Sequence, residues 1–315
     1  MKKKQAKWVQ QIIIFNSMKY NFSATRNLIT IIFTSFILQA YTQNITVKES
    51  IPQKMGRWGL TFAEEFDGTA LRSNEWFTYY PYTEDGSDSC VFCRTHGDAE
   101  SQIYLDENVE VKDGKLLLIA KREDAQWMGT ERKFTSGMVQ SKQNFGMGYY
   151  EFRAKLPAGQ GLWPALWTFG AKSAEIDFME ARMKKPKRFH ISVHNWNIRQ
   201  MEYKRVRSKT DLSEDFHVYA MVWDSNFLKF YFDGQEVWTL CKYTTRSGRN
   251  PRNCENAIAK RFGTQAVFPS DDERLNLLMN IAILPEVDEP VRSSAVRATF
   301  PSRMEIDYVR VYTKE

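Results

Sequence analysis

Residues 175–180 of this 315-residue chain carry three acidic side chains among large apolar ones, in the order Glu175-Ile176-Asp177-Phe178-Met179-Glu180. In a regular β-strand, residues two positions apart face the same way, so Glu175 and Asp177 share a face. Glu180 reaches that face only if a β-bulge at Phe178-Met179 adds one residue and resets the alternation. We therefore predict one surface lined by three carboxyls, with Ile176 and one bulge residue packed behind it.

Three carboxyls on one surface repel one another when ionised, which moves their pKa values apart. Glycoside hydrolysis with retention uses such a pair, about 5 to 5.5 Å apart: a nucleophile, and an acid that later acts as a base. A third carboxyl between them can orient the nucleophile and raise the pKa of the acid. An acidic strand taken alone is also typical of a solvated sheet edge, so the flanking residues must decide.

The elements that position these acids are predicted to be strands. Asp113-Gly114 and Asp233-Gly234 each separate two runs of β-forming residues, which indicates tight hairpins. Residues 149–154 are also strand-like, and residues 304–312 alternate at period two. We see no internal repeat, no linker and no long amphipathic helix between residues 55 and 315. This pattern predicts an all-β sandwich or jelly roll.

The flanking residues resemble glycoside hydrolase family 16. Trp163-Pro164-Ala165-Leu166-Trp167 followed by residues 175–180 is similar to that family's W-P-A-x-W and E-[I/L]-D-x-(x)-E strands. Further similar blocks follow the family's order over nearly all of residues 55–315: 62–68 with Trp76, 100–104 with 108–109, 136–139, 148–155 and 306–312. The resemblance implies a β-jelly-roll sandwich of two antiparallel sheets with a substrate cleft on the concave face.

Roles for the three acids follow from the same resemblance. It implies that Glu175 is the nucleophile, Glu180 the general acid/base and Asp177 a helper in a retaining reaction that needs no catalytic cofactor. The six-residue motif is similar to the branch that holds laminarinases, agarases, porphyranases and carrageenases. It is less like the five-residue motif of lichenases and xyloglucan transglycosylases.

Seven other side chains are candidates to bind the polysaccharide: Trp163, Trp167, His194, Trp196, Glu100, Gln102 and Arg182. Trp163 and Trp167 share a face of their strand, where their rings either stack on sugars or pack in the core. His194 and Trp196 share a face of a strand expected beside the acids. Glu100 and Gln102 also share a face, from which they could hydrogen-bond a sugar.

A structural calcium site is a further expectation from the family. Many members bind calcium on the convex side, and Glu65, Gly114 and Asp307 occupy the corresponding places. Oxygen ligands of this kind suit Ca²⁺, although Asp307 could instead cap a hairpin.

Residues 1–43 have the features of a secretory leader. Residues 28–38 are mostly apolar and follow Lys19 and Arg26, and they are fewer than the roughly 20 residues that span a bilayer. The alternatives are a short membrane anchor or a buried N-terminal helix. We predict a leader at 1–43, a catalytic domain at 55–315, and a secreted (extracellular or periplasmic) monomer without a membrane span.

The charge distribution excludes one class of partner. The formal net charge is +6, but residues 1–43 hold six Lys or Arg and no acid, so the remainder is formally neutral. This argues against nucleic-acid binding. From Arg182 to Lys209 there are ten Lys or Arg and one acid, Glu202. That run is either a solvated face or a cleft rim that attracts an anionic substrate.

The four cysteines are Cys90, Cys93, Cys241 and Cys254. In an exported chain they are expected to pair, and the economical pairing joins Cys90 to Cys93 and Cys241 to Cys254. The sequence itself allows three connectivities. A zinc site is disfavoured because the second pair lacks the C-x-x-C spacing.

The substrate expectation depends on two local features. Only residues 168–174 connect Trp167 to Glu175, and the motif continues as Glu180-Ala181-Arg182, unlike the Glu-Tyr-x-Gly that laminarinases tend to show. Together with the basic run, these features favour a sulfated or agar-type algal galactan. The alternative is an endo-β-1,3-glucanase (laminarinase). A non-catalytic carbohydrate-binding module is disfavoured because all three acids are present.

Overall fold

The computed structural model describes residues 57–97, 99–255, 262–291 and 295–315. Every described strand belongs to one compact unit, Glu49–Glu315. The predicted leader lies outside the described residues. Among those described, no helix is long and apolar enough to cross a membrane.

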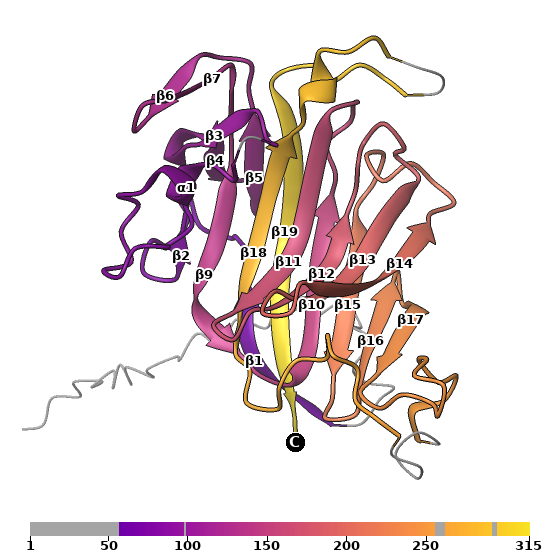
Figure 1. Cartoon of the computed structure of the whole chain (residues 1–315). Helices are drawn as coiled ribbons and strands as arrows, with labels where there is room; N and C mark the ends of the chain where they lie inside the picture. The colour runs from indigo at the N-terminus through magenta and orange to yellow at the C-terminus, as the bar shows by residue number, and fades with distance from the viewer. Residues whose placement is uncertain (1–56, 98, 256–261, 292–294) are drawn as a thin grey trace, which may run out of the picture. The chain divides into compact units, whose positions relative to one another are not determined.

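Two antiparallel sheets make up most of the described chain (Figure 1). The outer sheet has the order β17 (Gln235–Cys241), β16 (Phe227–Phe232), β15 (His217–Trp223), β10 (Gly148–Lys155), β19 (Ser302–Lys314), β5 (Lys115–Ala120) and β4 (Val109–Lys112), with β1 (Trp58–Glu64) also paired to β19. The concave sheet has the order β14 (Gln200–Arg207), β13 (Arg188–Asn195), β12 (Ala174–Glu180), β11 (Leu162–Gly170), β18 (Leu275–Ile283), β9 (Met138–Phe145) and β2 (Trp76–Phe77).

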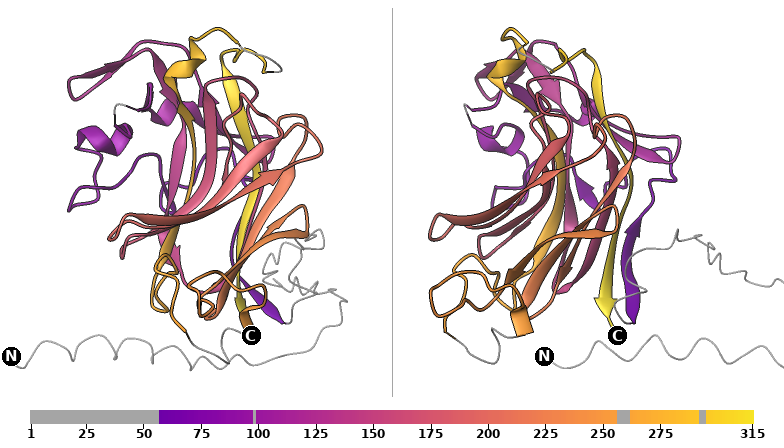
Figure 2. Two further views of the ribbon diagram at one scale, coloured as in Figure 1. Left: turned by 45° about the vertical axis from the view of Figure 1, so that its right-hand side comes forward. Right: turned by 90° about the vertical axis from the view of Figure 1, so that its right-hand side faces the viewer.

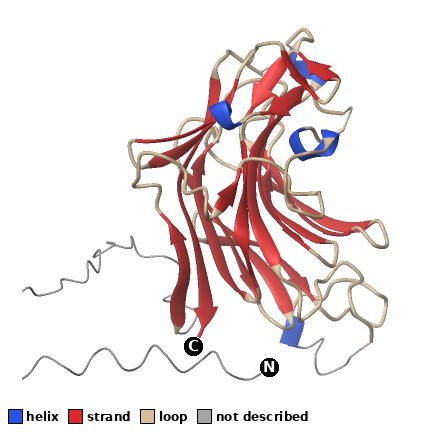
Figure 3. Cartoon of the chain, turned by 90° about the vertical axis from the view of Figure 1, so that its left-hand side faces the viewer, coloured by secondary structure: helices blue, strands red, loops and turns tan. Residues whose placement is uncertain are grey.

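Several smaller elements lie outside the two large sheets. They are the parallel pair β3 (Gln102–Tyr104) and β8 (Phe134–Ser136), the hairpin β6 (Ala125–Trp127) and β7 (Thr130–Arg132), and the short helices α1 (Val91–Arg94), η2 (Asp106–Asn108) and η3 (Pro285–Val287). Strands are the main regular secondary structure of the described residues, and loops with a few short helical turns connect them (Figure 3).

The main hydrophobic core lies between the two sheets, which stack as layers in Figure 2. The outer sheet contributes Tyr150 and Phe152 from β10, and the concave sheet contributes Ile176 and Phe178 from β12. The rings of Phe152 and Phe178 meet edge-on with their centroids 4.9 Å apart. The prediction of an all-β sandwich of antiparallel sheets is therefore confirmed.

The two predicted hairpins are present. Asp113 and Gly114 join β4 to β5 with φ of 52° and 68°, and Asp233 and Gly234 join β16 to β17 with φ of 46° and 79°. Positive φ at both central residues is the geometry that a tight two-residue turn demands. The disulfides join Cys90 to Cys93 and Cys241 to Cys254, which is the economical pairing.

Candidate active site

The acidic strand β12 contains the bulge that its sequence requires. On its β11 side, Leu166 pairs with Met179 and the next residue, Trp167, pairs with Asp177, so Phe178 is skipped. On its β13 side the register shifts between Asp177 and Glu180. Both bulge residues, Phe178 and Met179, are buried in the core, whereas the sequence pattern predicted only one of them there.

The bulge places all three carboxyls on the wall of one cavity of about 320 Å³. Its lining residues are Tyr80, His96, Glu100, Trp163, Ala165, Trp167, Glu175, Asp177, Glu180, His194, Trp196, Asn280 and Ala282. Most of these lie on β11, β12, β13 and β18, which are neighbours in the concave sheet. A pocket of large apolar and aromatic surfaces with a few convergent polar groups is the usual form of a ligand site.

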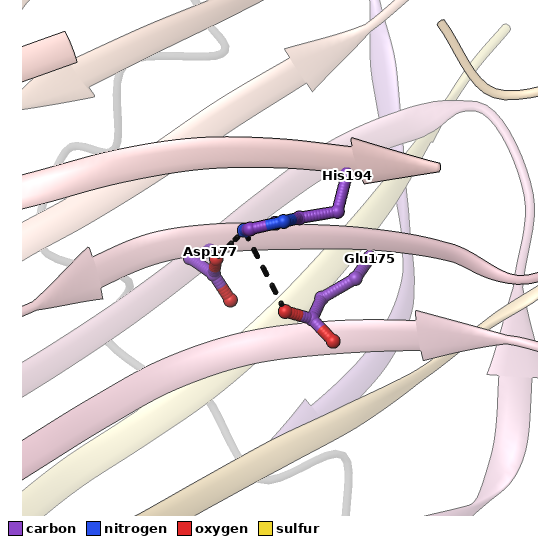
Figure 4. Close-up of side chains that lie close together, drawn as sticks. All are labelled: Glu175, Asp177 and His194. Carbon is purple, nitrogen blue, oxygen red and sulfur yellow. Dashed lines mark ion pairs between the residues drawn. The ribbon is translucent and has the colours of Figure 1, made fainter. Parts of the chain in front are cut away.

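His194 on β13 lies against two of the acids (Figure 4). Its Nε2 is 3.2 Å from Oδ2 of Asp177 and 3.7 Å from Oε1 of Glu175. In the part of the chain that the structure describes, these three form the one group of His, Cys, Asp or Glu side chains close enough to hold a metal ion. The same geometry lets the imidazole orient two carboxylates without any ion.

Two neutral donors hold the outer carboxyls. The indole Nε1 of Trp196 donates to Oε2 of Glu175 at 2.9 Å, and the hydroxyl of Ser192 donates to Oε2 of Glu180 at 3.2 Å. Trp196 stacks flat on His194, with ring centroids 5.4 Å apart. Trp196 therefore orients the carboxyl of Glu175, and Ser192 orients that of Glu180.

Burial raises the pKa of every acid in the cluster. For Glu175 burial and the adjacent Asp177 raise the pKa to about 8, opposed by His194 and the Trp196 N–H. The pKa of Asp177 is raised well above its usual range by burial and by Glu180. Burial also raises the pKa of Glu180, against the lowering effects of Ser192, His194 and Arg182. The cluster therefore holds protons at a pH where ordinary carboxyls have lost them.

Trp163 and Trp167 both line the cavity, as expected from their spacing. Trp167 is largely buried, and its indole N–H donates to Oδ1 of Asn280 at 2.9 Å. Trp163 is more open and carries the guanidinium of Arg182 at 5.1 Å from its ring centroid. Trp163 is therefore the better placed of the two to meet a sugar face, and Arg182 lies at the cavity rim.

Glu100 and Gln102 occupy different environments although they share a face. Glu100 lines the cavity, and burial raises its pKa to about 7. Gln102 is fully buried: its Oε1 accepts the backbone N–H of Ile283 at 2.7 Å, and its amide donates to Glu100. Gln102 consequently offers no free polar atom to a sugar and instead orients Glu100.

Four residues of the cavity surroundings were missed by the sequence analysis: Tyr80, Tyr82, His96 and Asn280. The rings of Tyr80 and Tyr82 stack 5.3 Å apart, and burial, Glu175 and Glu100 raise the pKa of the Tyr82 phenol to about 12. These tyrosines belong to an irregular segment without periodicity. The signal that the sequence did offer was the aromatic run at residues 79–82.

Arg94 holds this aromatic segment in place. It is 6% exposed, and its guanidinium pairs with Asp88 at 2.7 Å and Asp106 at 2.9 Å. It also lies over the ring of Trp127 at 5.0 Å. The backbone carbonyl of the adjacent Cys93 accepts the N–H of Tyr80 at 2.9 Å. These contacts connect the segment that carries Tyr80 and Tyr82 to α1, η2 and β6.

The calcium expectation finds no support in the geometry. The carboxylate of Glu65 accepts two hydrogen bonds from Arg310, at 2.6 and 2.8 Å, and Asp307 pairs with Arg153. Gly114 lies in the β4–β5 turn. Both carboxylates already have a cationic partner, which is a sufficient reason for acids to stand at these positions.

The chain matches a known protein family and is similar to several known proteins. Residues 97–260 match the family described as Glycosyl hydrolases family 16. The chain is similar to "Glucan endo-1,3-beta-glucosidase A1" of Niallia circulans, with 30% identity over 297 residues that cover 87% of this chain and 40% of that protein. It is also 27% identical to the "Beta-glucanase" of Rhodothermus marinus, over 89% of this chain and 93% of that protein.

A solved structure of a similar protein has the same fold. The catalytic domain of an endo-1,3-beta-glucanase (laminarinase) from Thermotoga petrophila RKU-1 superposes with a TM-score of 0.65 and 27% identity, over 82% of this chain and 99% of that one. The predicted enzyme class, a glycoside hydrolase, agrees with the family and with the names of these relatives. The family match covers more than half of the chain, and the chain therefore belongs to family 16 of the glycosyl hydrolases.

Proposed function

We propose that this chain is a retaining endo-β-1,3-glucanase. The observation that carries the proposal is the bulged strand β12, which puts Glu175, Asp177 and Glu180 on one cavity wall with raised pKa values. The linkage is suggested by the relatives, whose names specify 1,3-β-glucans or β-glucans. The algal galactan favoured by the sequence has no counterpart among those names and remains a test substrate.

In this proposal Glu175 is the nucleophile. Its Oε2 is held by the Trp196 N–H and its Oε1 faces His194, so the carboxylate has a fixed orientation toward the cavity. Attack on the anomeric carbon forms a glycosyl-enzyme ester and breaks the bond to the leaving oxygen. His194 favours the ionised form of Glu175, because it lowers the pKa that burial raises.

Glu180 supplies the proton to the leaving oxygen and then takes one from the incoming water. Burial keeps it protonated at higher pH than an ordinary carboxyl, and the Ser192 hydroxyl fixes its Oε2. Asp177, between the two, contributes by proton sharing and by orienting its neighbours. This chemistry needs no cofactor.

We also propose that the chain is exported. The support is the leader-like composition of residues 1–43 together with the two disulfides, which form and persist in oxidising compartments.

The test of the function is product analysis with laminarin, agarose, porphyran and carrageenans as separate substrates. Oligosaccharides from laminarin, with the β-anomer of the new reducing end appearing first in proton NMR spectra, are expected. Oligosaccharides from a galactan alone would refute the proposed substrate while leaving the catalytic acids assigned. An α-anomer appearing first would refute retention.

A further inference from the structure

The edge strand β14 lies beyond the catalytic strand β12 in the concave sheet, with β13 between them (Figure 1). Across β12, β13 and β14 the register aligns Glu180 with His190 and His190 with Arg205. Arg188 and Arg207 are paired two positions further along. Because alternate residues face alternate sides, these side chains continue the face that carries the acids, while Lys204 points to the opposite side.

A group of cations, which we call the basic edge, lies on this extension and on the loop before β13. Its members are Arg182, Lys185, Lys187, Arg188, Arg205 and Arg207. Among the described residues none of the six has an acidic ion-pair partner. Arg205 donates from Nε to Nε2 of His190 at 3.3 Å, so that imidazole nitrogen is an unprotonated acceptor. Burial lowers the pKa of His190, and the charges of Arg205, Arg182 and Lys185 lower it further.

Four members of the basic edge line a separate cavity of about 660 Å³: Lys185, Lys187, Arg188 and Arg207. Three acids also line this cavity, Asp211, Glu286 and Glu289, and two of them have partners of their own. Glu286 pairs with Lys184, and Asp211 accepts the backbone N–H and hydroxyl of Ser213 at 2.9 and 2.7 Å. Five cations line the cavity against three acids, so it has an excess of positive charge, which attracts anions.

The basic edge also offers an apolar surface of the kind that sugars contact. Tyr203 lies opposite Ser192 and is 54% exposed. It meets His190 edge-on, with ring centroids 6.2 Å apart. An aromatic face beside guanidinium forks suits a ligand that has both a sugar ring and an oxyanion.

We propose that the basic edge binds acidic substituents, sulfate esters or carboxylates, on the sugar units that extend beyond Glu180. The proposal rests on the proposed function at the catalytic acids and narrows its substrate to a β-linked polysaccharide that carries acidic groups. Guanidinium groups bind such oxyanions through two parallel hydrogen bonds, which fixes the position of the substituted sugar as well as attracting it. The row from Glu180 through His190 to Arg205 gives the direction in which the bound chain continues.

Affinity electrophoresis tests this proposal in gels that contain laminarin, partially sulfated laminarin or carboxymethylated laminarin. The protein carries Glu175→Gln, which prevents turnover, and is compared with and without R188A/R205A/R207A. The matched control is K112A/K204A/R303A, which removes three exposed cations elsewhere. We expect tighter binding of the charged gels, and a loss of at least about tenfold in that affinity for the first triple variant only. The sulfated and carboxymethylated gels distinguish the two kinds of oxyanion.

The proposal would be overturned by equal affinity for neutral and charged laminarin, or by equal losses in the two triple variants. Competition by double-stranded DNA as effective, per charge, as competition by sulfated laminarin would also overturn it, because any polyanion would then suffice. If wild-type enzyme cleaves none of the three laminarins but arginine-dependent binding persists, the proposed glucanase function is refuted, while the proposed binding of acidic groups by the basic edge is supported. A ratio of KM values for sulfated and neutral laminarin, measured on wild-type enzyme, provides an independent check of the binding result.

Discussion

Two sets of acidic side chains, on the two sheets of the sandwich, meet very different partners. On the outer sheet Glu65 is held by Arg310, Asp307 pairs with Arg153, and Glu151, 1% exposed, accepts the hydroxyls of Tyr149 and Tyr308. On the concave sheet Glu175, Asp177 and Glu180 have no lysine or arginine within ion-pair distance among the described residues, and Oδ2 of Asp177 lies 3.2 Å from Nε2 of His194.

The difference separates structural acids from reactive ones. A carboxylate with a cation or several donors is stabilised in its ionised form and contributes to the fold. Three carboxyls that mainly face one another are costly to ionise together, so they retain protons and exchange them readily. Acid content alone does not distinguish the two sets; the partners of each carboxyl do.

Removing an acid from the concave sheet should produce the largest effect on activity. Glu175→Ala is expected to lower kcat by on the order of 10⁴-fold or more, since no other group takes the place of the nucleophile. Glu180→Gln is expected to lower it by about 10² to 10⁴-fold through loss of proton transfer. Initial rates on laminarin measure both, and unaltered turnover in Glu175→Ala would remove that residue from the mechanism. Glu202→Gln, on the opposite face of β14, is the matched control.

Breaking an acid pair of the outer sheet should affect stability and leave activity intact. Arg310→Met leaves the Glu65 carboxylate without its cationic partner. We therefore expect the free energy of unfolding to fall by about 2 to 3 kcal/mol, with kcat unchanged. Urea denaturation measures the loss. Arg303→Met, an exposed residue on the same strand, provides the control. A fall in kcat in folded Arg310→Met would mean that the two sets of acids are coupled.

The pH profile should resolve the two catalytic acids by their neighbours. In the enzyme–substrate complex, which kcat reports, the acid limb follows ionisation of Glu175 and the basic limb follows loss of the proton from Glu180. The Trp196 N–H lowers the pKa of Glu175, so Trp196→Phe should move the acid limb to higher pH. Arg182 lowers the pKa of Glu180, so Arg182→Met should move the basic limb to higher pH.

His194 lowers both pKa values, so His194→Gln should move both limbs to higher pH. If Trp196→Phe moved only the basic limb, or Arg182→Met only the acid limb, the roles of Glu175 and Glu180 would have to be exchanged.

The smallest expected effect is that of a chelator. Because Arg310 and Arg153 already occupy the carboxylates of Glu65 and Asp307, we expect the Tm in EDTA to equal the Tm in added CaCl₂. A lower Tm in EDTA, recovered by calcium, would show that an ion competes with these pairs and would bring back the calcium prediction.

Local rules predicted the parts of the site that depend on alternation. The spacing from Glu175 to Glu180 required the bulge, and the spacing of Trp163 and Trp167 put both on the cavity side. The positive-φ turns at Asp113-Gly114 and Asp233-Gly234 were equally readable, because few other dipeptides adopt them without strain.

Long-range packing determined the parts that the sequence did not reveal. Tyr80 reaches the cavity because Arg94 and Cys93 fix an irregular segment, and no periodicity marks such a contact. Gln102 shares a face with Glu100 but is covered by β18, where the backbone N–H of Ile283 donates a hydrogen bond to Oε1 of Gln102. Of the three expected calcium ligands, Glu65 and Asp307 are acids that pair with arginines, and one sequence does not show which arginine will lie beside which carboxylate.

The most direct test of the account is to trap the covalent intermediate on wild-type enzyme with a 2-deoxy-2-fluoro-β-laminaribiosyl fluoride and to map the labelled peptide by mass spectrometry. We expect one added disaccharide, attached to Glu175, and inactivation that laminarin slows by competition. A label on Asp177 or Glu180, or an enzyme that keeps turning over laminarin without ever becoming labelled, would contradict it.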